Sequence, residues 1–228
     1  MNSLNVLVTR PIHQSENLSK LIREQAGNPI LFPVIEIKPL QTRLDYNINE
    51  FDLAIFISAN AVKYSIPLDI ECFAVGKATA NCLKTAKFPA PPFNSEALLE
   101  MPEMQKSAIS GKKIAVFRGE GGRELLAKTL RQRGASVTYM NVYKRVQPPV
   151  PAWIHNIKID IIIITSSEGL QNFMNMLNGQ AWIRNTPMVL ISKRIQVVAE
   201  NLGVIAPIFV APNASDEGLL AAILNYRN

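Results

Sequence analysis

Short apolar runs separated by stretches with helical periodicity recur along the whole chain. The clearest run is Lys158–Thr165, KIDIIIIT, and Leu4–Thr9 and Phe51–Ile57 are similar. Apolar runs of this length are typical of strands that are covered on both faces, as in parallel sheets. Between them, apolar residues recur every three or four positions, which predicts amphipathic helices. Strands that alternate with helices in this way predict parallel α/β layers.

Other elements are predicted from residue composition and from the residues that begin or end a helix or strand. β-Branched and aromatic residues mark strands, and serine, asparagine or glycine before a periodic stretch marks the start of a helix. Pro33 demotes part of one strand to an edge or connecting position. The predicted strands are 4–9, 30–37, 51–57, 72–75, 114–117, 136–146, 158–165, 188–191 and 204–210, and the predicted helices begin near Ser15, Ser58, Gly76, Ser95, Leu125, Ser166, Lys193 and Ser215.

A glycine-rich turn, Gly119–Gly122, follows the strand at 114–117 and leads into a helix. Glycine permits backbone angles closed to other residues and lets a ligand approach the amides. The amides and the positive dipole end of the helix favour an anion there, and Arg118 and Arg123 add full charges. The turn matches neither the dinucleotide fingerprint nor the P-loop. The alternative to an anion site is therefore a tight connection with arginines in solvent.

The chain contains an internal repeat. VLVTRP matches AVFRG and aligns Arg10 with Arg118, while DLAIFISANAV matches DIIIITSSEGL and aligns Ser58 with Ser166. Both pairs are 108 positions apart. The chain is therefore expected to hold two copies of one α/β unit.

Two extended, proline-flanked stretches, 32–39 and 140–147, are natural connectors between the two copies. If the chain leaves the first domain through one connector and returns through the other, that domain contains 1–35 and 148–228. The second domain then contains 40–140. Each domain would place its ligand-binding loops at the carboxyl ends of its strands.

The net charge of +6, from 24 basic and 18 acidic residues, suits an anionic partner. Because the basic residues are scattered and lack aromatic interleaving, a polyanionic small molecule fits better than nucleic acid. No segment is predicted to be transmembrane, and the first residues do not have the pattern of a signal peptide, so a cytoplasmic protein is expected. Cys72 and Cys82 have no spacing typical of a metal site, and we expect buried or idle thiols.

Six motifs, in this order, resemble the uroporphyrinogen-III synthase family: VLVTRP, FISANAV, AVGKATA, FRGEGGRELL, NVYKR and ITSSEGLQNF. The resemblance covers almost the whole chain. It implies two flavodoxin-like, doubly wound domains joined by a two-stranded linker, with the active site in the cleft between them. It also implies a lyase that cyclises hydroxymethylbilane, a linear tetrapyrrole polycarboxylate, to uroporphyrinogen III in heme biosynthesis. Water is lost and the last ring is inverted, without metal or organic cofactor.

The resemblance implies roles for individual residues. Tyr143 corresponds to the family's cleft tyrosine and is the candidate general acid for the leaving hydroxyl, and the alternative is a packing role in the linker. Ser58 and Ser166 would offer hydroxyls and neighbouring amides to carboxylates, beside or instead of helix capping. Arg10 and Arg118 are further implied members of the site, and either arginine could instead hold its own loop. The other implied substrate-binding residues are Asn60, Gly76, Lys77, Thr79, Gly119, Ser167, Ser192 and Lys193.

The second copy departs from the family pattern at Ser192 and Ile195, where glycine and threonine are expected. This departure keeps open an alternative, a non-catalytic two-domain anion-binding or regulatory module of the same fold. His13 and His155 are expected to lie in solvent or near helix ends. We expect a monomer that binds a small-molecule polycarboxylate and neither nucleic acid nor membrane. A transient contact with the enzyme that makes the substrate is left open.

Overall fold

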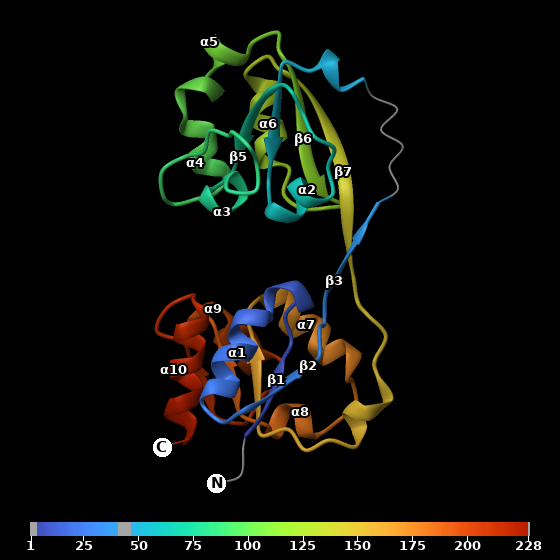
Figure 1. Cartoon of the computed structure of the whole chain (residues 1–228), viewed down its shortest axis with the longest axis vertical. Coiled ribbons are helices and arrows are strands. Elements are labelled where there is room, and N and C mark those ends of the chain that lie inside the picture. The colour runs from blue at the N-terminus through green and yellow to red at the C-terminus, as the bar shows by residue number, and fades with distance from the viewer. Residues whose placement is uncertain (1–3, 41–46, 228) are drawn as a thin grey trace. The chain divides into compact units, whose positions relative to one another are not determined.

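The computed structural model describes residues 4–40 and 47–227 and contains two separate five-stranded sheets (Figure 1). The chain divides into two compact units, unit 1 with residues 1–36 and 146–228, and unit 2 with residues 37–145. The predicted α/β class with two parallel-stranded sheets is confirmed. Within the described part of the chain, no helix is long and apolar enough to cross a membrane.

Unit 1 has the sheet order β10-β9-β8-β1-β2, and its paired strands are parallel. In chain order this is 5-4-3-1-2, the doubly wound order of flavodoxin-like sheets. Its strands are β1 (Asn5–Val8), β2 (Asn28–Leu31), β8 (Ile161–Ile164), β9 (Met188–Leu190) and β10 (Ile208–Val210). Its helices are η1 (Ile12–Gln14), α1 (Glu16–Glu24), η4 (Ala152–His155), α7 (Ser167–Met176), α8 (Trp182–Asn185), α9 (Lys193–Asn201) and α10 (Asp216–Arg227).

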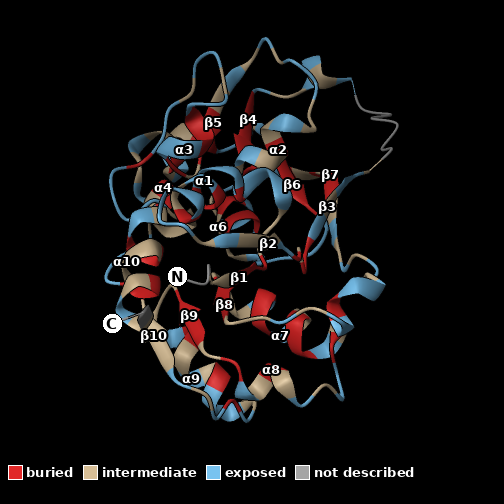
Figure 2. Cartoon of the chain, turned by 60° about the horizontal axis from the view of Figure 1, so that its bottom comes forward, coloured by how far each residue is buried: buried red, intermediate tan, exposed pale blue. Residues whose placement is uncertain are grey.

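The apolar pattern explains how unit 1 is layered. All four residues of β8 are buried, as expected of a central strand with helices on both faces (Figure 2). Leu18 and Ile22, four positions apart on α1, pack with Val6 and Val8 of β1. Helices α1 and α10 contact each other on this face, and α7 contacts α9.

Unit 2 has the sheet order β3-β7-β6-β4-β5, with parallel pairing of β4 with β5, β4 with β6, and β6 with β7. Separate apolar clusters line its two faces. Its strands are β3 (Glu36–Pro39), β4 (Leu53–Phe56), β5 (Glu71–Ala74), β6 (Lys113–Gly119) and β7 (Ser136–Val146). Its helices are η2 (Ile48–Glu50), α2 (Ala59–Lys63), α3 (Lys77–Ala80), α4 (Ser95–Glu100), η3 (Pro102–Met104), α5 (Lys106–Ile109) and α6 (Leu125–Gln132).

The 108-residue repeat is visible in the strand register. Leu7 pairs with Ile30 on one side and with Ile162 on the other. Ala115, which lies 108 positions after Leu7, pairs with Thr138 and Ala54, and these lie 108 positions from residues 30 and 162. Strands β1, β2 and β8 therefore correspond to β6, β7 and β4. The core residues correspond in the same way, as the pairs Val6/Ile114, Val8/Val116, Leu18/Leu126, Ile22/Leu130, Ile161/Leu53 and Ile163/Ile55.

Two predicted strands are wrong in extent. The stretch 30–37 is divided between β2 and β3. The N–H groups of Asn28 and Phe32 donate to the Leu4 and Val8 carbonyls, so an N–H at position 33 would point away from β1, and a proline is tolerated at this edge. The regular ladder ends where the Val34 N–H donates to the Thr9 carbonyl and no longer keeps that spacing. The stretch 204–210 forms a strand only at Ile208–Val210. The N–H groups of residues 205 and 206 instead donate to the Arg184 carbonyl.

Candidate functional site

The predicted site residues lie at the carboxyl ends of the strands in each unit. Open α/β sheets bind ligands at this edge, where neighbouring strands lead their helices in opposite directions. In unit 2 that point lies between β4 and β6, since β4 connects outward to β5 and β6 connects to β7. The predicted residues are Ser58, Asn60, Gly76, Lys77, Thr79, Arg118, Gly119 and Tyr143 in unit 2, and Arg10, Ser166, Ser167, Ser192 and Lys193 in unit 1.

The Tyr143 side chain is enclosed in unit 2, and its hydroxyl meets Ser58. Tyr143 is 1% exposed, and its hydroxyl oxygen lies 3.1 Å from Ser58 Oγ. Ser58 is the half-buried N-cap of α2, and its Oγ accepts a hydrogen bond of 3.1 Å from the Ala61 N–H. The pair therefore connects a buried phenol to a half-buried hydroxyl at the edge of the sheet.

Gly119 makes room for the Tyr143 ring. A Cβ at position 119 would lie 2.5 Å from the Tyr143 ring carbon Cε2. The β6–β7 register shifts between Arg118 and Gly119, so that Gly119 is the partner of Tyr143, and the Glu120 N–H donates to the Tyr143 carbonyl at 2.8 Å. Such irregularities re-aim side chains. The first glycine of the turn thus allows the backbone to approach the tyrosine closely.

Unit 1 has the same serine cap without the tyrosine. Ser166 Oγ accepts a hydrogen bond of 2.9 Å from an amide in the first turn of α7, as Ser58 does in α2. The position 108 residues before Tyr143 is Ile35, which is buried, and the position equivalent to Gly119 is Pro11. Capping is therefore common to both copies, and the phenol beside the cap belongs to unit 2.

The turn into α3 is tightly packed. A Cβ at Gly76 would lie 2.6 Å from Phe93 Cβ, so this position also needs glycine for close approach. Lys77 is exposed, whereas Thr79 is 7% exposed and lies inside the short helix.

The corresponding turn in unit 1 has a similar distribution of exposed and buried positions. Ser192 is the N-cap of α9 but makes no side-chain capping bond, and Lys193 is exposed. Ile195 is 1% exposed. The residue pair Thr79 and Ile195, which differ in chemistry, therefore both face the interior of their units.

Arg118 is held within its own loop. It is 4% exposed, its Nε donates to the Gly119 carbonyl at 3.2 Å, and its Nη1 lies 3.1 Å from Glu124 Oε1. Its guanidinium also lies over the Tyr139 ring, 4.4 Å from the centroid. Tyr139 donates its hydroxyl hydrogen to Glu124 Oε2 at 2.7 Å, which closes a three-residue network.

This network favours the ionised form of Glu124 and the neutral form of Tyr139. The hydrogen bond from Tyr139, together with that from Arg118, holds the pKa of the Glu124 carboxyl below its ordinary value. Burial and the hydrogen bond to Glu124 raise the pKa of Tyr139. A cavity of about 240 Å³ lies beside the network, and Arg123 on its wall pairs with Glu96. The cavity walls thus carry two arginines that already have carboxylate partners.

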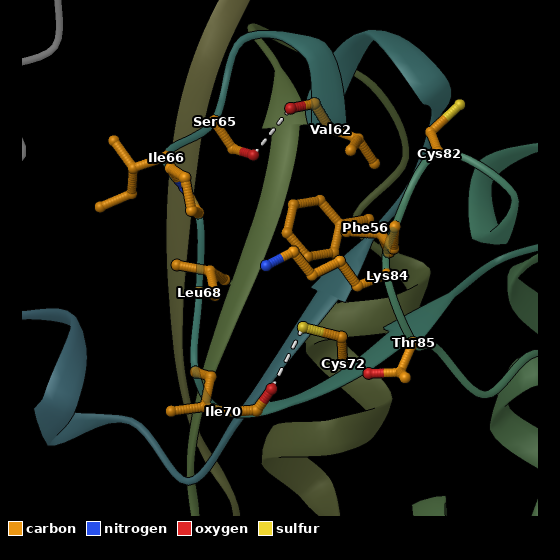
Figure 3. A pocket seen from close by; sticks show the side chains of 12 residues that line it. Phe56, Val62, Ser65, Ile66, Leu68, Ile70, Cys72, Cys82, Lys84 and Thr85 are labelled. Carbon is orange, nitrogen blue, oxygen red and sulfur yellow. Dashed lines mark hydrogen bonds between the residues drawn. The ribbon is translucent and has the colours of Figure 1, made fainter.

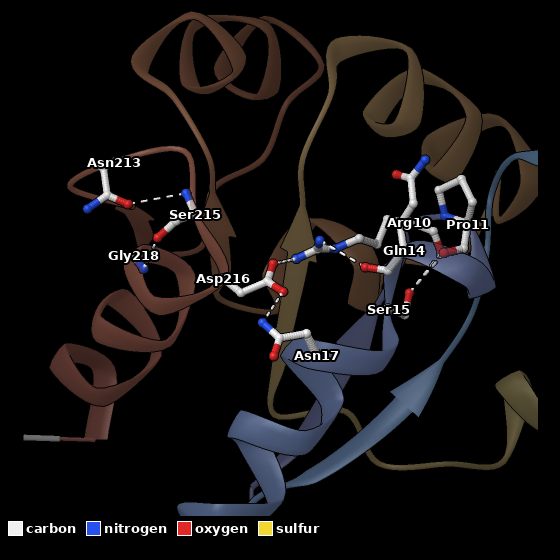
Figure 4. A network of polar contacts seen from close by, with 9 residues as sticks. All are labelled: Arg10, Pro11, Gln14, Ser15, Asn17, Asn213, Ser215, Asp216 and Gly218. Atoms are coloured by element: carbon white, nitrogen blue, oxygen red, sulfur yellow. Dashed lines mark hydrogen bonds and ion pairs between the residues drawn. The ribbon is translucent and has the colours of Figure 1, made fainter. Parts of the chain in front are cut away.

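Arg10 is likewise tied to a carboxylate (Figure 4). Its guanidinium forms an ion pair with Asp216 at the start of α10 and donates to the Gln14 carbonyl at 3.0 Å. Asn17 of α1 donates to the other Asp216 oxygen at 2.8 Å. Since the Arg10 side chain is 13% exposed, its local role is to join the loop after β1 to α1 and α10.

A second cavity, of about 280 Å³, lies in unit 2 beside the end of α2 and the start of β5 (Figure 3). Leu68, Ile70 and Phe56 form apolar walls, and the Lys84 side chain points into it. Cys72 donates its thiol hydrogen to the Ile70 carbonyl at 3.3 Å, and burial, helped by Glu71, raises its pKa. Cys72 and Cys82 are free thiols. None of the predicted site residues lines this cavity.

Sequence reasoning missed three residues that hold the predicted arginines, namely Tyr139, Glu124 and Asp216. Tyr139 could have been found from strand register. The partner of Arg118 in β7 is Asn141, and Tyr139, two positions earlier, lies diagonally across from Arg118 on the same face. Asp216 is 206 positions from Arg10, and only the fold brings them together.

The chain matches the family described as uroporphyrinogen-III synthase HemD over residues 16–221. It is 31% identical to the uroporphyrinogen-III synthase of Salmonella typhimurium and 30% identical to that of Escherichia coli, and each alignment covers 96% of this chain and all of the relative. The solved structure of uroporphyrinogen-III synthetase from Helicobacter pylori has the same fold, with a TM-score of 0.69 at 17% identity over 98% of this chain and 100% of that chain.

Proposed function

The chain belongs to the uroporphyrinogen-III synthase family, and we propose that it converts hydroxymethylbilane to uroporphyrinogen III in heme biosynthesis. In this reaction the linear tetrapyrrole loses its terminal hydroxyl as water, the last ring is inverted and the macrocycle closes. The activity is that of a cyclising lyase that works without metal or organic cofactor. The enzyme's contributions would be to hold the chain in a productive shape and to protonate the leaving hydroxyl.

The single observation that carries the proposal is the Tyr143–Ser58 contact at the switch point of unit 2. A buried phenol usually has a hydrogen-bond partner whatever its role, so what distinguishes Tyr143 is that its partner lies at the ligand-binding edge of the sheet. Here the bulge, the glycine and the serine all converge on the phenol. We therefore favour a role in proton transfer for Tyr143 over a purely structural role.

Groups at the same edges could bind the substrate carboxylates. Lys77 and Lys193 are exposed at the starts of α3 and α9. Asn60, Ser167 and Ser192 are half-buried polar residues at the starts of their helices and offer further donors. The net charge of +6 favours a polycarboxylate over long range.

We further propose that the protein acts as a cytoplasmic monomer. The free thiols of Cys72 and Cys82 fit a reducing compartment. The nature of the substrate requires neither nucleic acid nor a membrane as partner.

The test is to supply hydroxymethylbilane and to separate the uroporphyrinogen isomers. Wild-type protein should give isomer III, while isomer I alone, the spontaneous product, would instead support the non-catalytic anion-binding module. Tyr143→Phe should slow isomer III formation by about 10- to 100-fold, because general acid catalysis is worth roughly 100-fold or more and water can replace it in part. Unchanged kinetics in that variant would return Tyr143 to a packing role.

A further inference from the structure

We propose that Ser58, and not Tyr143, donates the proton directly to the leaving hydroxyl, and that Tyr143 then reprotonates Ser58. This inference rests on the proposed function. Tyr143 is 1% exposed, and among the described residues its hydroxyl has Ser58 as its sole hydrogen-bond partner. Ser58 is half-buried and belongs to the first turn after β4. In this arrangement a ligand at the sheet edge meets the serine before it meets the phenol.

Either oxygen of the Tyr143–Ser58 contact can be the donor, and the other hydrogen bonds favour one direction for the relay. A serine hydroxyl has one hydrogen to donate and two acceptor positions. One acceptor position of Ser58 is taken by the Ala61 N–H at 3.1 Å. The buried Tyr143 hydroxyl hydrogen needs an acceptor, and Ser58 Oγ at 3.1 Å supplies it through the second position. The Ser58 hydrogen is then free to point toward a ligand.

The transfer balances without any added reagent. The Ser58 Oγ–H bond breaks as its proton is transferred to the substrate's hydroxyl oxygen. The C–O bond then breaks, and water departs with the electron pair of that bond. The Tyr143 O–H bond breaks at the same time and restores the serine hydroxyl, which leaves a phenolate. When a pyrrole ring gives up its proton during ring closure, that proton returns through Ser58 to Tyr143. Both residues are then ready for another turnover.

The internal repeat supplies a comparison that separates relay from capping. Ser166 caps α7 as Ser58 caps α2, with capping bonds of 2.9 Å and 3.1 Å. Its copy has Ile35 at the position equivalent to Tyr143, so among the described residues no phenol takes the place of the tyrosine beside Ser166. The cost of losing the cap alone can therefore be calibrated from the stability of Ser166→Ala, for which about 1 kcal/mol is expected.

The experiment measures single-turnover formation of isomer III in full-length variants at saturating hydroxymethylbilane. Ser58→Ala should lose about 10- to 100-fold in rate, as Tyr143→Phe does. The double variant should be no slower than the slower single variant, because residues that act in series are not additive. Ser58→Thr, which keeps the hydroxyl, should recover most of the rate.

Ser58→Asn decides between the relay and a structural role. Asparagine is a good N-cap and should restore the stability lost in Ser58→Ala, but it has no hydroxyl to pass a proton. We expect wild-type stability with the slow rate of Ser58→Ala. Wild-type turnover in Ser58→Asn, or losses that multiply in the double variant, would overturn the relay while the synthase function stands. Isomer I alone from the wild-type protein would remove both.

Discussion

The two arginines that the repeat aligns, Arg10 and Arg118, each have a carboxylate partner in their own unit, Asp216 and Glu124. A substrate carboxylate would have to displace these partners and would gain little, because the arginine charge is already balanced. Lys77 and Lys193 are exposed, and among the described residues neither has an ion-pair partner. At the residue scale, the lysines are therefore better placed than the arginines to bind the substrate.

Gly119→Ala should disturb the Tyr143 ring directly. The added methyl would lie 2.5 Å from a ring carbon, closer than any ordinary contact, so the ring or the bulge must move. Overpacking of this kind costs about 1 to 3 kcal/mol. We expect a lower urea midpoint and a slower rate of isomer III formation, because the hydroxyl would leave Ser58.

The control for that clash is the same substitution in a background with a smaller side chain. In Tyr143→Leu, the Gly119→Ala change should cost less stability than it does in the wild-type protein. An equal cost in both backgrounds would show that the backbone of the turn, rather than the ring, requires glycine.

Glu124→Gln should change how stability depends on pH. The native network lowers the Glu124 pKa, so its contribution is present above the unfolded-state pKa and is lost as the pH falls through the folded-state pKa. The difference in urea midpoint between wild type and variant should therefore be largest near neutral pH and should vanish in acid. A difference that stays constant with pH would mean that the carboxylate charge is not its cause.

At the scale of elements, both copies use the same devices at the edge that binds ligands. A serine caps the helix after β4 or β8, and an arginine at the end of β6 or in the loop after β1 is tied to a nearby carboxylate. In unit 1 that carboxylate belongs to Asp216, whose other oxygen binds Asn17 of α1. One side chain thus joins three elements of the fold.

Asp216→Ala should loosen this junction. It would leave the largely buried Arg10 guanidinium without its carboxylate, at a cost of about 1 to 3 kcal/mol, since the pair keeps some contact with solvent. Asn17→Ala, which removes a neighbouring bond and leaves the ion pair, is the matched control and should cost less. The comparison is made by urea denaturation, and a larger loss in Asn17→Ala would show that the Arg10 pair contributes little.

Much of this level of organisation could be predicted from the sequence. Apolar runs such as Ile161–Ile164 predicted the parallel sheets, because such a run is a local signal. The 108-residue spacing predicted the duplicated unit, because a repeat is found by comparing the chain with itself. The sequence predicted that Pro33 would demote part of the stretch 30–37, but it could not predict the residue at which β2 ends, since the end of the ladder depends on pairing with β1. Nor could it place Tyr143 against Ser58, because the contact depends on a register shift between two strands.

At the scale of the whole molecule, the two units have separate sheets and separate apolar cores. Unit 2 is a single continuous stretch, 37–145, inserted between the two pieces of unit 1. A unit with its own core and its own sheet meets the requirements of an independent domain. The insertion makes unit 2 the part that can be excised by simple truncation.

The fragment 37–145 should therefore fold alone. We expect a single cooperative urea transition by circular dichroism, as small single domains show. Trp153 and Trp182, the two tryptophans of the chain, both belong to unit 1, so tryptophan fluorescence of the full chain reports only on unit 1. Circular dichroism of the full chain should then show two urea transitions. One should have the midpoint measured by fluorescence, and the other should have the midpoint of the isolated fragment. A fragment that unfolds without cooperativity would show that unit 2 depends on the rest of the chain for its stability.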